Sequence, residues 1–149
     1  MKQKDYFINC PRDIYFLYDG KTFVQQNTDI PQAFYPIIGI VAEDSNYNIT
    51  CCSFINACLD IEGRHRGRKS YCRIRFSSGD DNNIVVQSVE LIHQRQGYMT
   101  RLYDILKHIK RTYRTGDIII QSVLSAEGES WCRKMGLIPD GNGNFVSKK

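Results

Sequence analysis

The residues with the clearest chemical meaning are those from Gln94 to Met99, which read Gln-Arg-Gln-Gly-Tyr-Met. They follow an apolar run rich in β-branched residues and precede a segment whose apolar residues have helical spacing. A strand, a polar turn and a helix in this order leave free backbone N–H groups at the start of the helix, where an anion can bind. Gly97 has no side chain, so a ligand can approach its backbone closely. We therefore predict a diphosphate site at this turn.

Two arginines add positive charge near the turn, since Arg95 lies within it and Arg101 lies near the start of the predicted helix. The alternative is an ordinary connection between a strand and a helix, in which Gly97 only relieves crowding. One glycine is a weak signal, and the local pattern alone favours that alternative.

Regular elements must hold this turn in place, and the second half of the chain predicts them in alternation. Apolar residues recur at helical spacing between Leu102 and Tyr113, while residues 84–91 form the best strand pattern in the chain. The predicted elements are a strand over 84–91, a helix that ends at Gly116, a strand over 118–123, a helix from the cap Ser125 to Met135 with Gly136 as its stop, and a short strand at 145–146.

The first half of the chain has mostly strand patterns. The predicted elements are a hairpin over 14–24 on an Asp-Gly turn, a loop or short helix over 31–36, a buried strand over 37–42, strands over 49–59 and 70–76 with a basic turn over 62–69 between them, and a polar turn over 80–83. Antiparallel strands followed by strand–helix–strand–helix–strand predict an α+β fold with a mixed α/β sheet.

Residues Gln94 to Met99 also resemble the Gln/Arg-x-x-Gly-x-Gly/Ala motif of the GNAT superfamily of acyl-CoA N-acyltransferases. A second stretch, from Ser125 to Leu137, resembles that family's signature Asn-x-x-Ala-x-x-aromatic-Tyr-x-Lys-x-Gly-Phe. The matching residues there are Trp131, Lys134, Gly136 and Leu137. The two stretches occur in the expected order with a predicted strand between them, so the resemblance covers residues 84–137.

The resemblance implies a GNAT-like, mostly antiparallel and partly splayed sheet, flanked by helices, that binds acetyl-CoA in a V-shaped opening. Backbone groups at about Val89 to Leu91 would bind the pantetheine and thioester, and the N–H groups of Gln96 to Thr100 would hold the pyrophosphate. An amine acceptor would attack the thioester directly, helped by positioning and carbonyl polarisation. The cofactor-binding residues so implied are Val89, Leu91, Gln94, Arg95, Gln96, Gly97, Tyr98, Met99, Thr100 and Ser125.

Three positions depart from the family pattern. Met99 stands where Gly or Ala is usual, and Ser125 replaces Asn. Cys132 stands where the family usually has a Tyr that protonates the leaving thiolate; a thiol can do the same, and the first alternative is a buried cysteine that only packs. Tyr98 or a water could supply the proton instead, or the reaction could need no acid. Glu90, on the strand before the motif, is the candidate base for the acceptor ammonium, the alternative being a side chain that faces solvent. The candidate catalytic residues are thus Glu90 and Cys132.

The basic turn offers a different function. Its cations Arg64, Arg66, Arg68 and Lys69 could contact the phosphates of a nucleic acid or of CoA, although a solvated hairpin tip is the commoner meaning of such a turn. The net charge of +4 and pI near 8.7 permit a phosphate-rich partner without requiring one.

Composition narrows the class of protein further. With 149 residues, 42% of them hydrophobic and 24% charged, the chain fits one globular domain over residues 1–149. No signal peptide or membrane span is expected, so a cytoplasmic protein is the default. The six cysteines include no C-x-x-C pair and the three histidines are scattered, so we expect no metal site and mostly buried thiols.

Together these observations predict an N-acetyltransferase that moves an acetyl group from acetyl-CoA to an amine on a small molecule, a protein or an aminoacylated RNA. Two alternatives stay open: a GNAT fold that binds CoA or a partner protein without catalysis, and a basic nucleic-acid-binding module.

Overall fold

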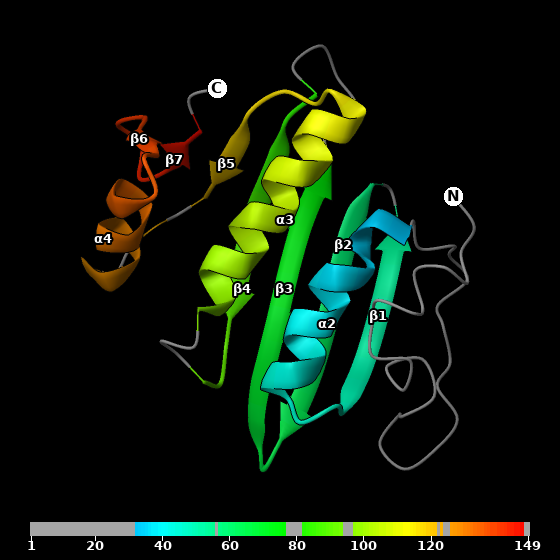
Figure 1. Ribbon diagram of the computed structural model, residues 1–149. Helices are drawn as coiled ribbons and strands as arrows, with labels where there is room; N and C mark the ends of the chain where they lie inside the picture. The colour runs from blue at the N-terminus through cyan, green and yellow to red at the C-terminus, as the bar shows by residue number, and fades with distance from the viewer. Residues whose placement is uncertain are drawn as a thin grey trace.

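The computed structural model describes residues 32–55, 57–76, 82–93, 97–121, 123 and 126–147, which form helices around a single sheet (Figure 1). The elements are η2 (Gln32–Phe34), α2 (Tyr35–Asp44), β1 (Ile49–Ile55), β2 (Cys58–His65), β3 (Arg68–Phe76), β4 (Ile84–Glu90), α3 (Tyr98–Tyr113), β5 (Ile118–Ile120), α4 (Ala126–Lys134), β6 (Ile138–Pro139) and β7 (Phe145–Val146). The predicted hairpin over 14–24 lies outside the described residues.

The strands follow the order β1-β2-β3-β4-β5-β7-β6. Each neighbouring pair is antiparallel except β4 and β5, which are parallel because α3 connects them. The predicted α+β class and mostly antiparallel sheet are therefore confirmed.

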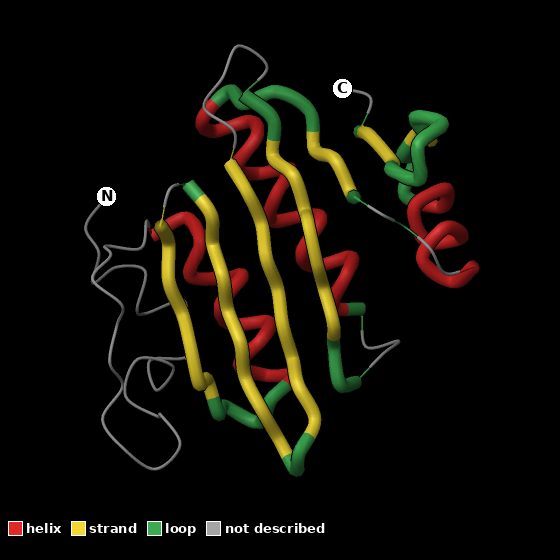
Figure 2. The backbone as a smooth tube through the Cα atoms, turned by 180° about the vertical axis from the view of Figure 1, so that it is seen from behind, coloured by secondary structure: helices red, strands yellow, loops and turns green. Residues whose placement is uncertain are grey.

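Two helices cover one face of the antiparallel strands. In Figure 1, α2 and α3 lie side by side in front of β1 to β4, and Figure 2 shows the opposite face of these strands without a described helix over it. Buried side chains from the helices and strands, such as Ile38, Ile61, Ile74 and Leu106, form the core between the two layers.

The segment over 37–42 is part of the helix α2, so the predicted strand was wrong. Nearly every residue of α2 is buried, and a helix buried on most sides has a continuous apolar run instead of an alternating pattern. Pro36 lies in the first turn of this helix, a position that suits its fixed φ and its missing N–H group.

The first-half strands also differ in their bounds. The strand expected over 49–59 is two strands, β1 and β2, which pair across a turn that includes Ala57 at a φ of 61°. Most of the predicted basic turn belongs to β2 and β3, and only Arg66 and Gly67 form the tip, both with positive φ. Two positive φ values match the twist of a tight hairpin.

Helix α3 has the predicted amphipathic pattern, with Leu102, Leu106 and Ile109 buried and charged residues exposed. Its end differs from the prediction, because Arg114 takes the left-handed conformation at a φ of 54°, in place of Gly116. Gly116 instead donates its N–H to the carbonyl of Asn82 at 2.7 Å. None of the described helices is long and apolar enough to cross a membrane.

Candidate functional site

The parallel strands β4 and β5 pair over a short length and then diverge. Residues 84–86 pair with residues 118–120, and the last contact is the N–H of Gln121 donating to the carbonyl of Val86 at 3.0 Å. Beyond it, β4 continues to Glu90 beside β3, and no described strand pairs with it on the β5 side. Half of the backbone groups of residues 87–90 therefore face an opening between the two strands.

A β-bulge lies where the strands part. Arg73 pairs with Ser88 but Ile74 pairs with Val86, so Gln87 is an extra residue in β4. A bulge bends its strand and increases the local twist, which turns the end of β4 away from the direction of β5.

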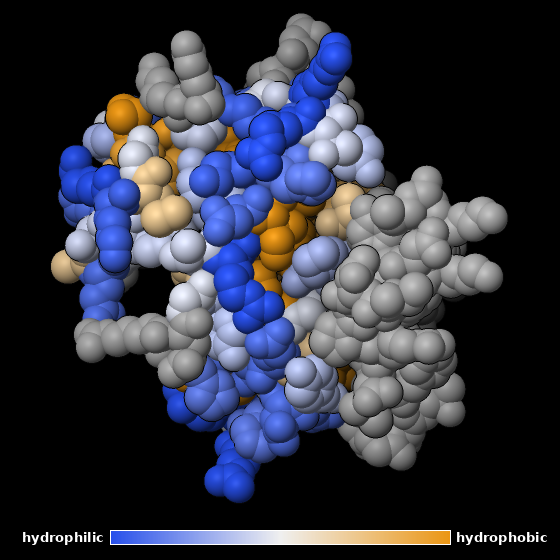
Figure 3. Space-filling model, in the orientation of Figure 1, coloured by the Kyte–Doolittle hydropathy of each residue, from blue (hydrophilic) through white to orange (hydrophobic). Residues whose placement is uncertain are grey.

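The opening is a cleft of about 1010 Å³. Residues 86–89, Leu91 and His93 line one side, and residues 97–100 line the end. The other side is lined by Ile120, Gln121, Val123 and residues of α4. The space-filling view is hollowed in the same place, between α4 and the part formed by β4 and α3 (Figure 3). The structure thus brings seven of the candidate site residues together at one cleft, namely Val89, Leu91, Gly97, Tyr98, Met99, Thr100 and Cys132.

Gly97 is the N-cap of α3 and has a φ of 76°. A Cβ built on it would meet no atom within 4 Å, so the glycine is needed for its backbone conformation and does not relieve crowding. Among the described residues no side chain caps the helix, and its first hydrogen bond runs from the N–H of Arg101 to the carbonyl of Gly97 at 3.0 Å. The N–H groups of residues 98–100 are left at the positive end of a helix of 16 residues, which favours an anion.

The side chains at this helix start have different surroundings. Met99 lines the cleft and also packs against the hydrophobic core. Arg101 is turned away from the role expected for it, because its two terminal nitrogens each lie 2.9 Å from a carboxylate oxygen of Glu43. This bidentate contact lowers the pKa of Glu43 and neutralises the charge that we expected Arg101 to bring to the turn.

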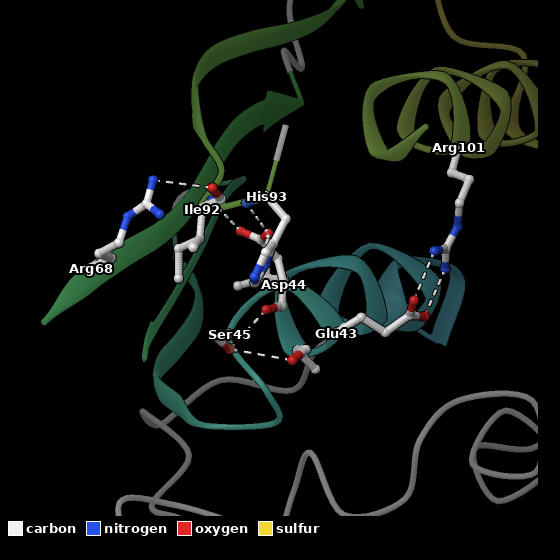
Figure 4. Close-up of polar contacts among 9 residues, drawn as sticks. Glu43, Asp44, Ser45, Arg68, Ile92, His93 and Arg101 are labelled. Atoms are coloured by element: carbon white, nitrogen blue, oxygen red, sulfur yellow. Dashed lines mark hydrogen bonds and ion pairs between the residues drawn. The ribbon is translucent and has the colours of Figure 1, made fainter. Parts of the chain in front are cut away.

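A buried carboxylate holds the chain just before the turn. Asp44, at the end of α2, accepts hydrogen bonds from the N–H groups of Ile92 at 2.6 Å and His93 at 2.8 Å (Figure 4). The sequence does not reveal Asp44, because it follows Glu43 at the end of an apolar run that fits a strand, and no local pattern separates the two acidic residues.

The far wall of the cleft contains Trp131 and Cys132 of α4. The indole N–H of Trp131 donates to Oγ1 of Thr100 at 3.2 Å, and its ring meets the ring of Tyr103 edge-on at 5.9 Å between centroids. Cys132 is only 1% exposed. Its burial, and to a smaller extent the negative charge of the nearby Glu129, raises the pKa of its thiol to about 11. The thiol is therefore protonated at neutral pH.

Glu90 is not among the residues that line the cleft. Its side chain is 62% exposed, and its carboxylate lies 4.0 Å from Nζ of Lys69. This placement matches the alternative of a solvent-facing side chain better than the role of a base.

The cations of the basic turn are largely engaged within the sheet. Arg64 pairs with Glu62 at 3.0 Å, Lys69 faces Glu90, and Arg68 donates to the carbonyl of Ile92 at 3.2 Å. The carboxylate partners of Arg64 and Lys69 reduce the positive charge available to a nucleic acid, whereas the carbonyl partner of Arg68 leaves its charge in place.

Some predicted residues fall outside the described part of the chain, namely Gln94, Arg95, Gln96 and Ser125. In the part that is described, no three His, Cys, Asp or Glu side chains come together as metal ligands would. Of the cysteines described there, Cys52, Cys72 and Cys132 are buried, Cys58 is half-buried and Cys51 is exposed.

Comparison with models of known protein families found none that matches this chain. Comparison with curated proteins likewise found no match.

Proposed function

We propose that this chain is an N-acyltransferase that transfers the acetyl group of acetyl-CoA to an amine, as its resemblance to the GNAT superfamily implies. One observation carries the proposal: the uncapped start of α3, behind a glycine of positive φ, opens on a cleft between two parallel strands that diverge at a bulge. This combines an anion site with an adjacent strand edge, which together suit a diphosphate attached to an extended, amide-containing chain.

In the proposed complex, the N–H groups at the start of α3 bind the diphosphate of acetyl-CoA. The unpaired backbone groups of β4 beyond the bulge exchange hydrogen bonds with the amides of the pantetheine, as an added strand would. The thioester then lies near the bulge, between β4 and the wall formed by Trp131 and Cys132.

The transfer itself needs positioning more than it needs strong acids or bases. The neutral amine attacks the carbonyl carbon, and a backbone N–H near the bulge stabilises the oxyanion that forms. Collapse of this intermediate breaks the C–S bond and expels the CoA thiolate, while the amine nitrogen loses a proton to water. The buried thiol of Cys132 is the candidate donor of a proton to the CoA thiolate. Cys132 then regains a proton from solvent.

The test is a thermal denaturation series followed by a turnover assay. Acetyl-CoA at 100 times its dissociation constant should stabilise the fold by about 2.7 kcal/mol. Release of free thiol from acetyl-CoA is then measured with small amines, lysine-containing peptides and an aminoacylated RNA as acceptors. Absence of a thermal shift with acetyl-CoA and with longer acyl-CoAs would refute the proposal.

A second candidate is a protein that binds CoA without transferring its acyl group. It is favoured by the chemistry of the cleft, where Glu127 is the only carboxylate among the described lining residues and the thiol of Cys132 is almost inaccessible. A thermal shift with acetyl-CoA but no thiol release with any acceptor would select this candidate.

A further inference from the structure

Two consecutive acidic residues at the end of α2 hold the two flanks of the connection that leads into α3 (Figure 4). Before the connection, Asp44 accepts the N–H of Ile92 on Oδ2 at 2.6 Å and the N–H of His93 on Oδ1 at 2.8 Å. After it, Glu43 binds the guanidinium of Arg101 through two contacts of 2.9 Å.

Asp44 has the burial of a residue with a specific task. Its exposed fraction is 0%, and a buried carboxylate is costly unless donors satisfy its oxygens. The two backbone N–H groups do so, and Nδ1 of His93 lies a further 3.1 Å from Oδ1. Hydrogen bonds to a charged acceptor are about twice as strong as neutral ones, so this contact fixes the backbone firmly.

The same peptide is held from its other side. Arg68 of β3 donates from a terminal nitrogen to the carbonyl oxygen of Ile92 at 3.2 Å. Ile92 thus has its N–H bound to a carboxylate and its carbonyl bound to a guanidinium. The negative charge of Asp44 and the positive charge of Arg68 thus both contact the main chain of Ile92. This residue lies between two cleft-lining residues, Leu91 and His93.

We propose that Asp44 is a positioning residue for the diphosphate site, and this inference rests on the proposed function. Asp44 is not among the residues that line the cleft, so it acts through the backbone of Ile92 and His93. By fixing where the chain leaves β4, it fixes how the N–H groups at the start of α3 face the cleft. Its own negative charge does not repel the ligand strongly, because the donors around it compensate that charge.

The experiment compares two acyl donors in Asp44→Asn. The amide has nearly the same shape as the carboxylate, but it turns one acceptor into an N–H donor that faces a backbone N–H. We expect the dissociation constant of acetyl-CoA, measured by calorimetry, to rise about 10-fold to 100-fold. Turnover of acetyl-pantetheine, which has no diphosphate, should stay within about twofold of the wild-type rate at the same amine concentration.

A matched control is Asp104→Asn, which removes a carboxylate from the exposed face of α3, where it pairs with Lys107 at 3.4 Å. It should leave both donors unaffected. Arg68→Gln is the second variant, because Arg68 is exposed and its loss releases, among the described groups, only the carbonyl of Ile92. It should show the same preference for acetyl-pantetheine with a smaller loss, about 3-fold to 10-fold.

The outcomes separate this inference from the proposed function. If the wild-type protein binds acetyl-CoA and Asp44→Asn binds it equally well, only the inference is overturned. If Asp44→Asn loses both donors to the same degree, Asp44 supports the fold in general and the inference is also overturned. If Asp44→Asn does not fold, the same comparisons are made with Arg68→Gln. If the wild-type protein itself binds no acyl-CoA, the proposed function and the inference fail together.

Discussion

Cys132 and Gly97 lie on different walls of one cleft, and different physical requirements explain each of them. Gly97 is required by the backbone, since a residue with a Cβ would meet no neighbour there but would have to adopt a φ of 76°. Cys132 is explained by its surroundings, because burial raises the pKa of its thiol to about 11. That value is close to the ordinary pKa of a tyrosine phenol, about 10, so the thiol resembles tyrosine as an acid.

This similarity leads to a prediction for Cys132. We expect Cys132→Ala to lower kcat for acetyl transfer by about 10²-fold, the lower end of the usual effect of an acid, because the CoA thiolate then leaves without a proton. Cys132→Ser keeps a donor and should lose less. Since the thiol stays protonated well above pH 7, the wild-type rate should not fall between pH 7 and pH 9 through this group.

The control for Cys132 is Glu90→Gln, which removes an exposed carboxylate outside the cleft lining and should leave kcat unchanged. The measurement is the initial rate of thiol release at saturating acetyl-CoA. Equal rates for Cys132→Ala and the wild-type protein would leave Cys132 as a packing residue only, and a lower rate for Glu90→Gln would restore Glu90 as the candidate base.

At the scale of elements, α2 shows most clearly what the sequence could not provide. Its apolar run over 37–42 fits a buried strand and a fully buried helix equally well, and only packing against both the sheet and α3 distinguishes them. The amphipathic helix α3 and the strand β4 were predicted correctly, because each has one buried side and therefore a readable period. The very short β6 was missed, since both of its residues are exposed and Pro139 has no N–H group to donate to a neighbouring strand.

The candidate site also contains residues that are local in the sequence and residues that only the fold brings near. Gly97 and the residues after it are local in sequence, and the strand–turn–helix pattern identified them. Asp44 was not predictable, because it lies 48 residues before Ile92 and its role depends on the placement of α2. The β-bulge at Gln87 was likewise hidden, since it exists only in the register between β3 and β4.

Helices α3 and α4 are joined across the end of the cleft by Trp131, whose indole N–H donates to Thr100. We expect Trp131→Phe to lower the free energy of unfolding by about 1 kcal/mol, the usual net value of one hydrogen bond, and to weaken acetyl-CoA binding. Thr100→Val removes the same bond from the other helix. If the hydrogen bond accounts for both effects, the double variant should lose at most about 0.5 kcal/mol more than the more affected single variant, as measured by urea denaturation. Fully additive losses would show that the two side chains act independently.

For the molecule as a whole, the cleft lies between two parts that share little main-chain pairing. The strands β1 to β4 with α2 and α3 form one part, and β5, β7, β6 and α4 form the other. Between them run three residue pairs of β4 and β5, the hydrogen bond from Trp131 to Thr100, and the contacts of Lys110 with Asp117 and Ser147. A ligand in the cleft contacts both parts, so its binding should stabilise the whole fold and not one element alone.

The buried thiols predict how stability depends on alkaline pH. Burial, with a smaller effect of Asp60, raises the pKa of Cys72 to about 12 from 9.0, so the folded protein keeps this proton where the unfolded chain releases it. A folded-state pKa above the unfolded value means that the stabilisation is complete below pH 9 and is lost as pH rises towards 12. Cys132 acts in the same direction between pH 9 and pH 11.

We therefore expect the free energy of unfolding to fall above pH 9, and Cys72→Val, which keeps a small apolar side chain at a site only 3% exposed, to flatten that fall. One proton fewer corresponds to a slope smaller by at most about 1.4 kcal/mol per pH unit. Urea denaturation at pH 7, 9, 10 and 11 measures both slopes. Between pH 7 and pH 9 the difference in free energy of unfolding between the variant and the wild-type protein should stay constant. Parallel curves up to pH 11 would show that Cys72 ionises alike in the folded and unfolded chains, in conflict with its burial under α2 and α3.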